Sequence, residues 1–243
     1  MKLFARQPAP PNVTLLNAWC SPFDDMMQVG AMRDFVDALL AFVAPAAIAS
    51  EINFGSARSI AGLLRGLGTM RPRDVESLIV SDERGAGVLN IVLVTSSLGS
   101  APPVFNVLAV FPCGAPAADE MLDVLAAYRI HYAYIRELSG EFSPQSETRI
   151  RRSLFGGVSV KVDGSFNHWL VPDRDVRGGA VRGIYPVNVL SDVALQRLAA
   201  TGLGLPASLP RRGGTVWRLS AEDKAELLRR NPTRGDVLHL DES

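Results

Sequence analysis

Apolar and polar positions in the first 145 residues predict a group of strands between helices. β-Branched and aromatic residues at 13–19 predict a first strand. Apolar residues at 32–43 recur at helical spacing and Pro45 follows them, so this stretch predicts a helix. Three apolar runs, at 75–81, 89–97 and 104–111, predict further strands. The turn-forming sequence DERGAG separates the first two, so we expect them to pair as an antiparallel hairpin.

Two further helices are predicted in the same region. Ser56 is the expected N-cap of a short helix that carries Ile60 and Leu64 on one face. A long helix is expected to start near Pro116 and to end just before Gly140, because proline suits a first helical turn and glycine often follows a helix end. Its apolar stripe would consist of Met121, Leu125, Tyr128, Tyr132 and Ile135.

The second half of the chain is richer in glycine and arginine. Alternating valines predict a hairpin at 157–172. The segment GIYPVNVLSD, residues 183–192, is expected to be extended, and its Pro186 places it at a sheet edge or a bulge. Asp192 is the expected cap of the next helix.

A strand and a helix are predicted to complete the second half. Residues 214–220, GTVWRLS, predict the strand. Ser220 and Asp223 predict a capping box at the start of the helix.

The strands cluster and do not alternate strictly with helices. This order favours an α+β fold, with antiparallel strands and helices packed on one face, over a doubly wound parallel sheet. We expect a single domain over residues 1–243, with 1–145 and 146–243 as two possible similar halves.

Composition and charge limit the partners. The 243 residues are 47% hydrophobic and 21% charged, and Lys plus Arg equals Asp plus Glu at 25 each. A nucleic-acid partner is therefore not expected, since binders of phosphates usually carry a basic excess. Proline and arginine interrupt the apolar N-terminus, so a signal peptide is not expected. The longest apolar run is too short to span a bilayer. We expect a cytoplasmic protein that makes no membrane contact.

Few residues suit catalysis or metal binding. The three histidines, His131, His168 and His239, form no metal-ligand spacing, and His131 is expected in a hydrogen-bonded core or boundary position on the long helix. GxSxG is absent, and GLGLPA follows a helical stretch instead of a strand. Cys20 and Cys113 are expected as two buried free thiols, although the sequence leaves a disulfide open.

One enzymatic alternative is a metal-dependent nuclease. Asp173 and Glu222 would hold Mg²⁺ and Lys224 would position the attacking water. In such nucleases the Glu and Lys lie on a strand, whereas here they open a predicted helix. We therefore expect that the chain is not an enzyme and that it has no catalytic residue, cofactor or metal ligand.

The last part of the chain carries a family resemblance. RGIYPVNVLSD, then an amphipathic stretch, PRRGGTVWRLS, a helix and NPTRGD follow one another in the order seen in bacterial immunity proteins. These immunity proteins belong to polymorphic toxin and type VI secretion effector systems, and the chain resembles their C-terminal half. The resemblance implies an α+β protein, cytoplasmic or periplasmic, that binds and neutralises a cognate toxin or effector, and we expect it in the cytoplasm as a monomer or a homodimer. A non-catalytic structural or adaptor component of a secretion system or phage particle is the remaining alternative.

Partner-binding residues are expected among exposed arginines and one tyrosine, since these types anchor interfaces. The arginine-rich stretches have two interpretations. They form an ordinary solvated surface, or they form a docking face for an acidic partner. Within 183–192, we expect Ile184, Val187, Val189 and Leu190 to pack inward and Tyr185 and Asn188 to face outward. The candidate anchors are Arg177, Arg182, Tyr185, Arg211 and Arg212.

Overall fold

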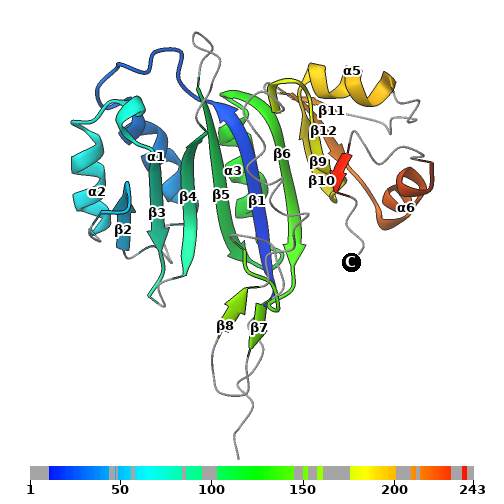
Figure 1. Ribbon diagram of the computed structural model, residues 1–243, viewed down its shortest axis with the longest axis horizontal. Coiled ribbons are helices and arrows are strands. Elements are labelled where there is room, and N and C mark those ends of the chain that lie inside the picture. The colour runs from blue at the N-terminus through cyan, green and yellow to red at the C-terminus, as the bar shows by residue number, and fades with distance from the viewer. Residues whose placement is uncertain are drawn as a thin grey trace, which may run out of the picture.

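A computed structural model describes most of the chain (Figure 1). The described residues are 11–43, 47, 49–55, 58–83, 86–94, 103–144, 150–152, 158–160, 176–200, 209–211, 214–230 and 237–239.

The central strand is β1 (Val13–Ser21), and its side chains are buried from Thr14 to Ser21. Alternation along the strand sends Leu16, Ala18 and Cys20 to one face of the sheet and Leu15 and Trp19 to the other. β1 pairs antiparallel with β5 on one side and with β6 on the other. Both faces of the sheet are therefore covered at its middle.

A nine-stranded sheet forms around β1 in the order β11-β12-β10-β6-β1-β5-β4-β3-β2, and each pair in it is antiparallel. Its other strands are β2 (Ala49–Ile52), β3 (Ser77–Ser81), β4 (Gly87–Val94), β5 (Val104–Pro112), β6 (Arg129–Leu138), β10 (Val187–Leu190), β11 (Leu209–Arg211) and β12 (Gly214–Arg218).

Two small ladders flank the large sheet. β7 (Ile150–Arg152) pairs antiparallel with β8 (Val158–Val160). β9 (Val181–Gly183) pairs in parallel with β13 (Val237–His239).

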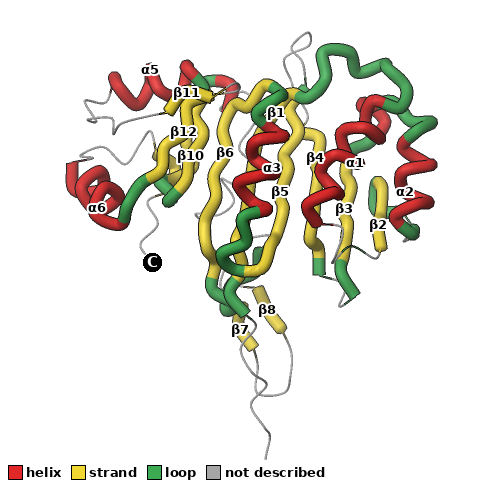
Figure 2. The backbone as a smooth tube through the Cα atoms, turned by 180° about the vertical axis from the view of Figure 1, so that it is seen from behind, coloured by secondary structure: helices red, strands yellow, loops and turns green. Residues whose placement is uncertain are grey.

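Three helices cover one face of the sheet, as seen from behind in Figure 2. They are α1 (Ala31–Val43), α2 (Ile60–Leu67) and α3 (Ala117–Leu125). Their apolar stripes and the inward side chains of β1, β3, β4 and β5 form the larger hydrophobic core. A 3-10 turn, η1 (Pro72–Asp74), lies between α2 and β3.

The opposite face is covered around β6, β10 and β12. Helices α5 (Asp192–Ala200) and α6 (Ala221–Arg230) contribute Ala194, Leu198 and Leu227 to a second buried cluster there. Figure 1 shows both helices at this end of the sheet. No helix in the described part of the chain is long and apolar enough to cross a membrane.

The predicted fold class is confirmed: the chain is α+β and its large sheet is antiparallel. Helices α1, α2 and α3 pack on one face as expected, whereas α5 and α6 pack on the other. The strands at 13–19, 75–81, 89–97, 104–111 and 214–220 correspond to β1, β3, β4, β5 and β12. The sheet is continuous across the point where two halves were expected to meet, because β6 pairs with β10.

The predicted long helix from Pro116 to Gly140 is wrong. Helix α3 ends at Leu125, and the next ten-residue element, β6, is a strand. Tyr132 and Tyr134 belong to one buried cluster, and Ala133 between them belongs to the other. A strand that is buried on both faces lacks the alternation of apolar and polar residues that would identify it.

Several local predictions also change. Ser59, and not Ser56, caps α2, since its Oγ accepts from the Gly62 N–H at 3.2 Å. Ser191, and not Asp192, accepts from the Ala194 N–H at 3.3 Å at the start of α5. The Ser220–Asp223 capping box before α6 is confirmed, since the Asp223 N–H donates to Ser220 Oγ at 3.0 Å and the Ser220 N–H donates to Asp223 Oδ2 at 3.0 Å.

The strand placements in the second half are also revised. Pro186 precedes β10, which is an interior strand, so the predicted edge position is wrong. The Pro186 carbonyl accepts a hydrogen bond from the Leu219 N–H at 2.8 Å. Of the hairpin predicted at 157–172, the structure describes β8, which pairs with the preceding β7, while residues 161–172 lie outside the described part.

Close packing of Gly179 against α5 gives a stability prediction. Gly179 has φ +78°, and a Cβ there would lie 2.8 Å from the backbone N of Ala194. Gly114 has a similar φ of +73°, but a Cβ there would meet nothing within 4 Å. We expect Gly114→Ala to cost about 1–2 kcal/mol from the left-handed conformation alone. Gly179→Ala should cost clearly more, as measured by urea unfolding, and equal losses would contradict the close approach.

Candidate functional site

The five predicted partner-binding residues do not share one surface. Arg182 and Tyr185 are buried, with 4% and 2% of their surface exposed, so their expected role as exposed anchors is wrong. Arg177 is half-buried. Arg211 lies in β11, but its side chain is outside the described part of the structure, as is the whole of Arg212.

Arg182 and Tyr185 belong to an aromatic–arginine cluster on the sheet face opposite α1, α2 and α3. We define this cluster as Trp19, Tyr132, Tyr134, Arg136, Arg182 and Tyr185. The rings of Tyr134 and Tyr185 stack with centroids 4.0 Å apart. Trp19 stacks on Tyr132 at 5.6 Å. Strands β1 and β6 present Trp19, Tyr132 and Tyr134 from the sheet, and segment 181–185 lies over them.

Two guanidinium groups lie against these rings. The Arg182 Cζ is 5.3 Å from the Tyr134 ring centroid and 5.9 Å from that of Tyr185. The Arg136 Cζ is 5.2 Å from the Tyr185 centroid. Arg182 Nη1 also donates a hydrogen bond to the Tyr134 hydroxyl. Cation–π contacts and this hydrogen bond compensate part of the desolvation that a buried guanidinium suffers.

A chain of hydrogen bonds extends the cluster across the sheet. Asn106 Nδ2 donates to Asn17 Oδ1 at 2.6 Å, and Asn17 Nδ2 donates to the Tyr134 hydroxyl at 3.1 Å. The Tyr132 hydroxyl donates to the Gly183 carbonyl at 3.0 Å. These bonds connect β5, β1 and β6 to β9 through side chains.

Segment 183–192 has two parts: residues 183–185 lie over the sheet, and residues 187–190 form its interior strand β10. Asn188 Nδ2 donates to the Tyr185 carbonyl at 2.6 Å, and the Tyr185 N–H donates to Asn188 Oδ1 at 3.2 Å. Both residues are buried, so the prediction that Tyr185 and Asn188 face outward is wrong. The side chains of Ile184, Val189 and Leu190 are buried as expected. The bonds between Tyr185 and Asn188 therefore fix the turn by which the chain passes from the covering residues into β10.

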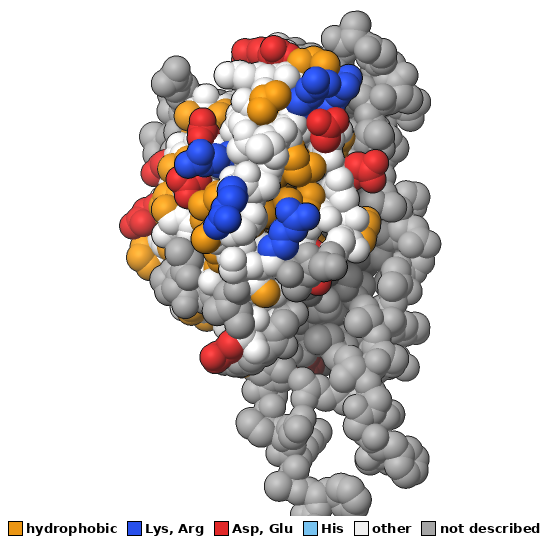
Figure 3. All heavy atoms as spheres, turned by 90° about the vertical axis from the view of Figure 1, so that its left-hand side faces the viewer, with side chains coloured by type: hydrophobic (Ala, Val, Ile, Leu, Met, Phe, Trp, Pro, Cys, Tyr) orange, Lys and Arg blue, Asp and Glu red, His pale blue; other side chains and the backbone are white. Residues whose placement is uncertain are grey.

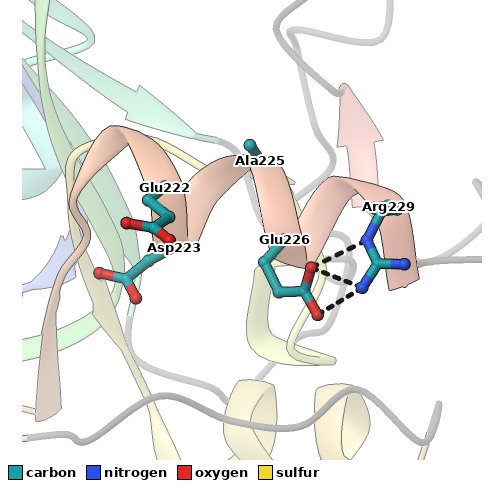
Figure 4. A pocket seen from close by; sticks show the side chains of 5 residues that line it. All are labelled: Glu222, Asp223, Ala225, Glu226 and Arg229. Carbon is teal, nitrogen blue, oxygen red and sulfur yellow. Dashed lines mark hydrogen bonds and ion pairs between the residues drawn. The ribbon is translucent and has the colours of Figure 1, made fainter.

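Acidic residues on α6 line a shallow pocket (Figure 4). Asp223 Oδ2 accepts from Ser220 Oγ at 2.7 Å and from the Ser220 N–H at 3.0 Å, and these bonds lower the Asp223 pKa. Arg229 binds both oxygens of Glu226 at 2.8 Å. Glu222 and Lys224, from the nuclease alternative, lie on this helix and not on a strand, while Asp173 lies outside the described residues. Within the described ranges, no three His, Cys, Asp or Glu residues are grouped as a metal site would require.

The histidines and cysteines are placed as follows. His131 is buried on β6, where its Nε2 lies 2.9 Å from Ser21 Oγ, so the hydrogen-bonded core position is confirmed but the helix is not. His239 lies in β13, and His168 lies outside the described residues. Cys20 is buried and Cys113 is exposed, and both are free thiols, so the prediction that both are buried is wrong for Cys113.

Sequence reasoning missed Phe54, which is 80% exposed and the most exposed large hydrophobic side chain in the described part of the chain. It follows Asn53 at the end of β2. The available signal was Asn53-Phe54-Gly55 directly after a strand, because Asn and Gly are typical of turns that need a positive φ.

The hydroxyl of Tyr134 allows a test of the cluster. Tyr134→Phe removes the acceptor for Arg182 and Asn17 and leaves buried donors unsatisfied, so we expect a loss of about 1–3 kcal/mol in the free energy of unfolding. Tyr128→Phe is the matched control, since Tyr128 is half-buried and its ring packs edge-on against Phe35 at 5.1 Å. The two losses, measured by urea denaturation, would be equal if the Tyr134 hydroxyl contributed nothing.

The two thiols should react differently. Burial raises the pKa of Cys20 to about 12, and a hydrogen bond to Glu137 raises that of the exposed Cys113. We expect Ellman's reagent to modify Cys113 in the native protein and Cys20 only after unfolding. Because the thiolate reacts, Glu137→Ala should lower the Cys113 pKa and speed its modification at about pH 8. Native labelling that survives Cys113→Ser would contradict this assignment.

Comparisons with known proteins show a fold likeness. No protein-family model matches the chain, and no curated protein matches it. Among solved structures, the chain is similar to the Pseudomonas aeruginosa T6SS (type VI secretion system) protein PA0821, with a TM-score of 0.51 and 13% sequence identity. The match covers 84% of this chain and 64% of that chain, so this chain spans less than two thirds of that structure. At this identity, the likeness shows a shared fold.

Proposed function

We propose that this chain is a protein of a type VI secretion system that binds a cognate toxin or effector and neutralises it by stoichiometric binding. The observation that carries the proposal is the fold likeness to PA0821, itself named a T6SS protein, over 84% of this chain. The sequence resemblance of residues 182–236 to immunity proteins of such systems is independent of that comparison. In this proposal the protein acts in the cytoplasm as a monomer or homodimer, without a cofactor, metal or catalytic residue.

The arrangement of the resembling segments supports this interpretation. RGIYPVNVLSD and PRRGGTVWRLS supply β10 and β12, which pair side by side in the large sheet. Leu190 and Trp217 from these strands are buried in the second cluster. The resemblance therefore concerns the framework of the domain, and a scaffold of this kind leaves other surfaces available for a partner. A standard interface needs only about 800 Å² from each partner.

The test is co-expression of this chain with the toxic domain encoded beside its gene. We expect growth rescue, co-purification with an inactive variant of the toxic domain, and a 1:1 complex in light scattering after size-exclusion chromatography. An immunity protein from an unrelated toxin pair is the control for specificity. Binding without rescue would indicate an adaptor, and a well-folded chain that neither binds nor rescues would exclude the proposal.

A further inference from the structure

Phe54 lies in an unfavourable backbone conformation that its own packing does not explain. Asn53 and Phe54 have φ of 51° and 57°, and the Gly55 N–H donates to the Ile52 carbonyl at 2.9 Å. This is a tight turn with two left-handed residues, in which glycine is the usual second residue. A bulky side chain with positive φ is an outlier. Because 80% of Phe54 is exposed, burial of its ring does not offset that strain.

The turn is held firmly from the neighbouring segment. Asn53 Nδ2 donates to the Asp74 carbonyl at 2.8 Å. Asn53 Oδ1 accepts from the N–H groups of Glu76 and Ser77 at 2.8 and 3.1 Å. A rigid turn that exposes an aromatic ring loses little conformational entropy when a partner binds that ring.

Arginines follow this turn, and two of them, Arg58 and Arg65, have no acidic residue within six positions in the sequence. Residues 55–73 include Arg58, Arg65, Arg71 and Arg73 and no Asp or Glu. Arg58 and Arg65 are exposed, and no ion pair involves either of them within the described residues. The Arg58 backbone bridges to Ser50 of β2, and a Cβ at Gly66 on α2 would lie 2.9 Å from Arg58 Nη1. The Arg58 backbone therefore lies beside β2, and its guanidinium lies against Gly66 of α2, next to Arg65 in the sequence.

Two further exposed apolar side chains lie in a loop that is bonded to the residues after α2. Met27 and Val29 are 46% and 55% exposed in the loop before α1. That loop bonds to the stretch after α2, since the Gly30 N–H donates to the Met70 carbonyl at 3.0 Å. Figure 3 looks onto this end of the molecule and shows Lys and Arg side chains beside hydrophobic ones across the middle of the face, with most acidic side chains toward its margins.

We infer that Phe54, Arg58 and Arg65 form a docking surface, the β2–α2 surface, for a protein that offers an apolar pocket bordered by carboxylates. Phe54 would fill the pocket, and the two arginines would pair with the carboxylates around it. The exposed acids Glu51, Asp74 and Glu76 flank the surface and would repel a continuous polyanion, so a protein fits better than a nucleic acid. The inference rests on the proposed function in naming the partner as the cognate effector.

The test places the photo-crosslinking residue p-benzoylphenylalanine at position 54 of the full chain, expressed in its native cell. Position 193 is the control, because Val193 is 48% exposed on α5, far along the sheet order from β2. We expect one crosslinked protein from position 54, identified by mass spectrometry through an acid-rich peptide, and no such product from position 193. Adding Arg58→Glu and Arg65→Glu to the same chain should abolish the crosslink.

Affinity measurements with the crosslinked protein complete the test. Phe54→Gly should weaken binding at least about tenfold. It should keep the thermal midpoint at or above that of the unmodified chain, because glycine accepts the positive φ. Val193→Ser is the matched control and should leave the affinity unchanged. Binding through the β2–α2 surface should also weaken as salt rises toward 1 M, where charges are screened within about 3 Å.

Each outcome separates this inference from the proposed function. A crosslinked effector supports both, and a crosslinked acidic protein outside any secretion system supports the surface but overturns the proposed function. Effector rescue with no product from position 54 overturns the surface alone. A product that survives charge reversal, a nucleic acid, or a second copy of this chain at position 54 also overturns the surface.

Discussion

The burial of β1 on both faces is the constraint on which the rest of the structure depends. A strand whose side chains are covered on both sides requires a layer on each face and a partner strand on each edge. Strands β5 and β6 supply the edges, and α1, α2 and α3 cover one face with an apolar core. The chain covers the other face with segments that come more than 150 residues after β1, so this face brings together the most distant parts of the described sequence.

That second face combines apolar packing with polar contacts. Trp19, Tyr132 and Tyr134 come from the sheet, and Arg182 and Tyr185 come from the covering segment. Stacked rings and hydrogen bonds have narrower geometric requirements than aliphatic contacts, so they fix how the covering segment lies. Arg182 and Tyr185, which the sequence suggested as binding anchors, therefore hold the covering segment against Tyr134 of β6.

The two ends of the sheet consequently differ. At one end, β10, β11 and β12 are followed by or packed with α5 and α6, and Arg182, Tyr185 and Trp217 are buried there. At the other end, β2 is a short edge strand followed by the exposed Phe54 and by the exposed Arg58 and Arg65. One end of the sheet is therefore closed by helices, and the other ends in a rigid turn with an exposed aromatic ring.

The sequence by itself determined the elements that have one apolar and one polar face or a local capping or turn signal. The α1 stripe, the hairpin of β3 and β4, and the Ser220–Asp223 capping box could all be predicted, because amphipathic spacing and capping depend on neighbouring residues. The α+β class followed from the order of these elements. Of the candidate site, the sequence singled out Arg182 and Tyr185, but as exposed anchors for a partner, whereas both are buried.

Only the tertiary structure decided which residues are covered. Tyr132 fits the predicted helical stripe as well as a strand, and the pairing of its segment with β1 and β10 decides for the strand. Arg182 became internal because Tyr134, 48 residues earlier, provides a ring and a hydroxyl for it. Phe54 stayed exposed because Asn53 bonds to residues 74–77 and holds the turn outward. Contacts between residues far apart in sequence decide burial, and no local pattern of residue types records them.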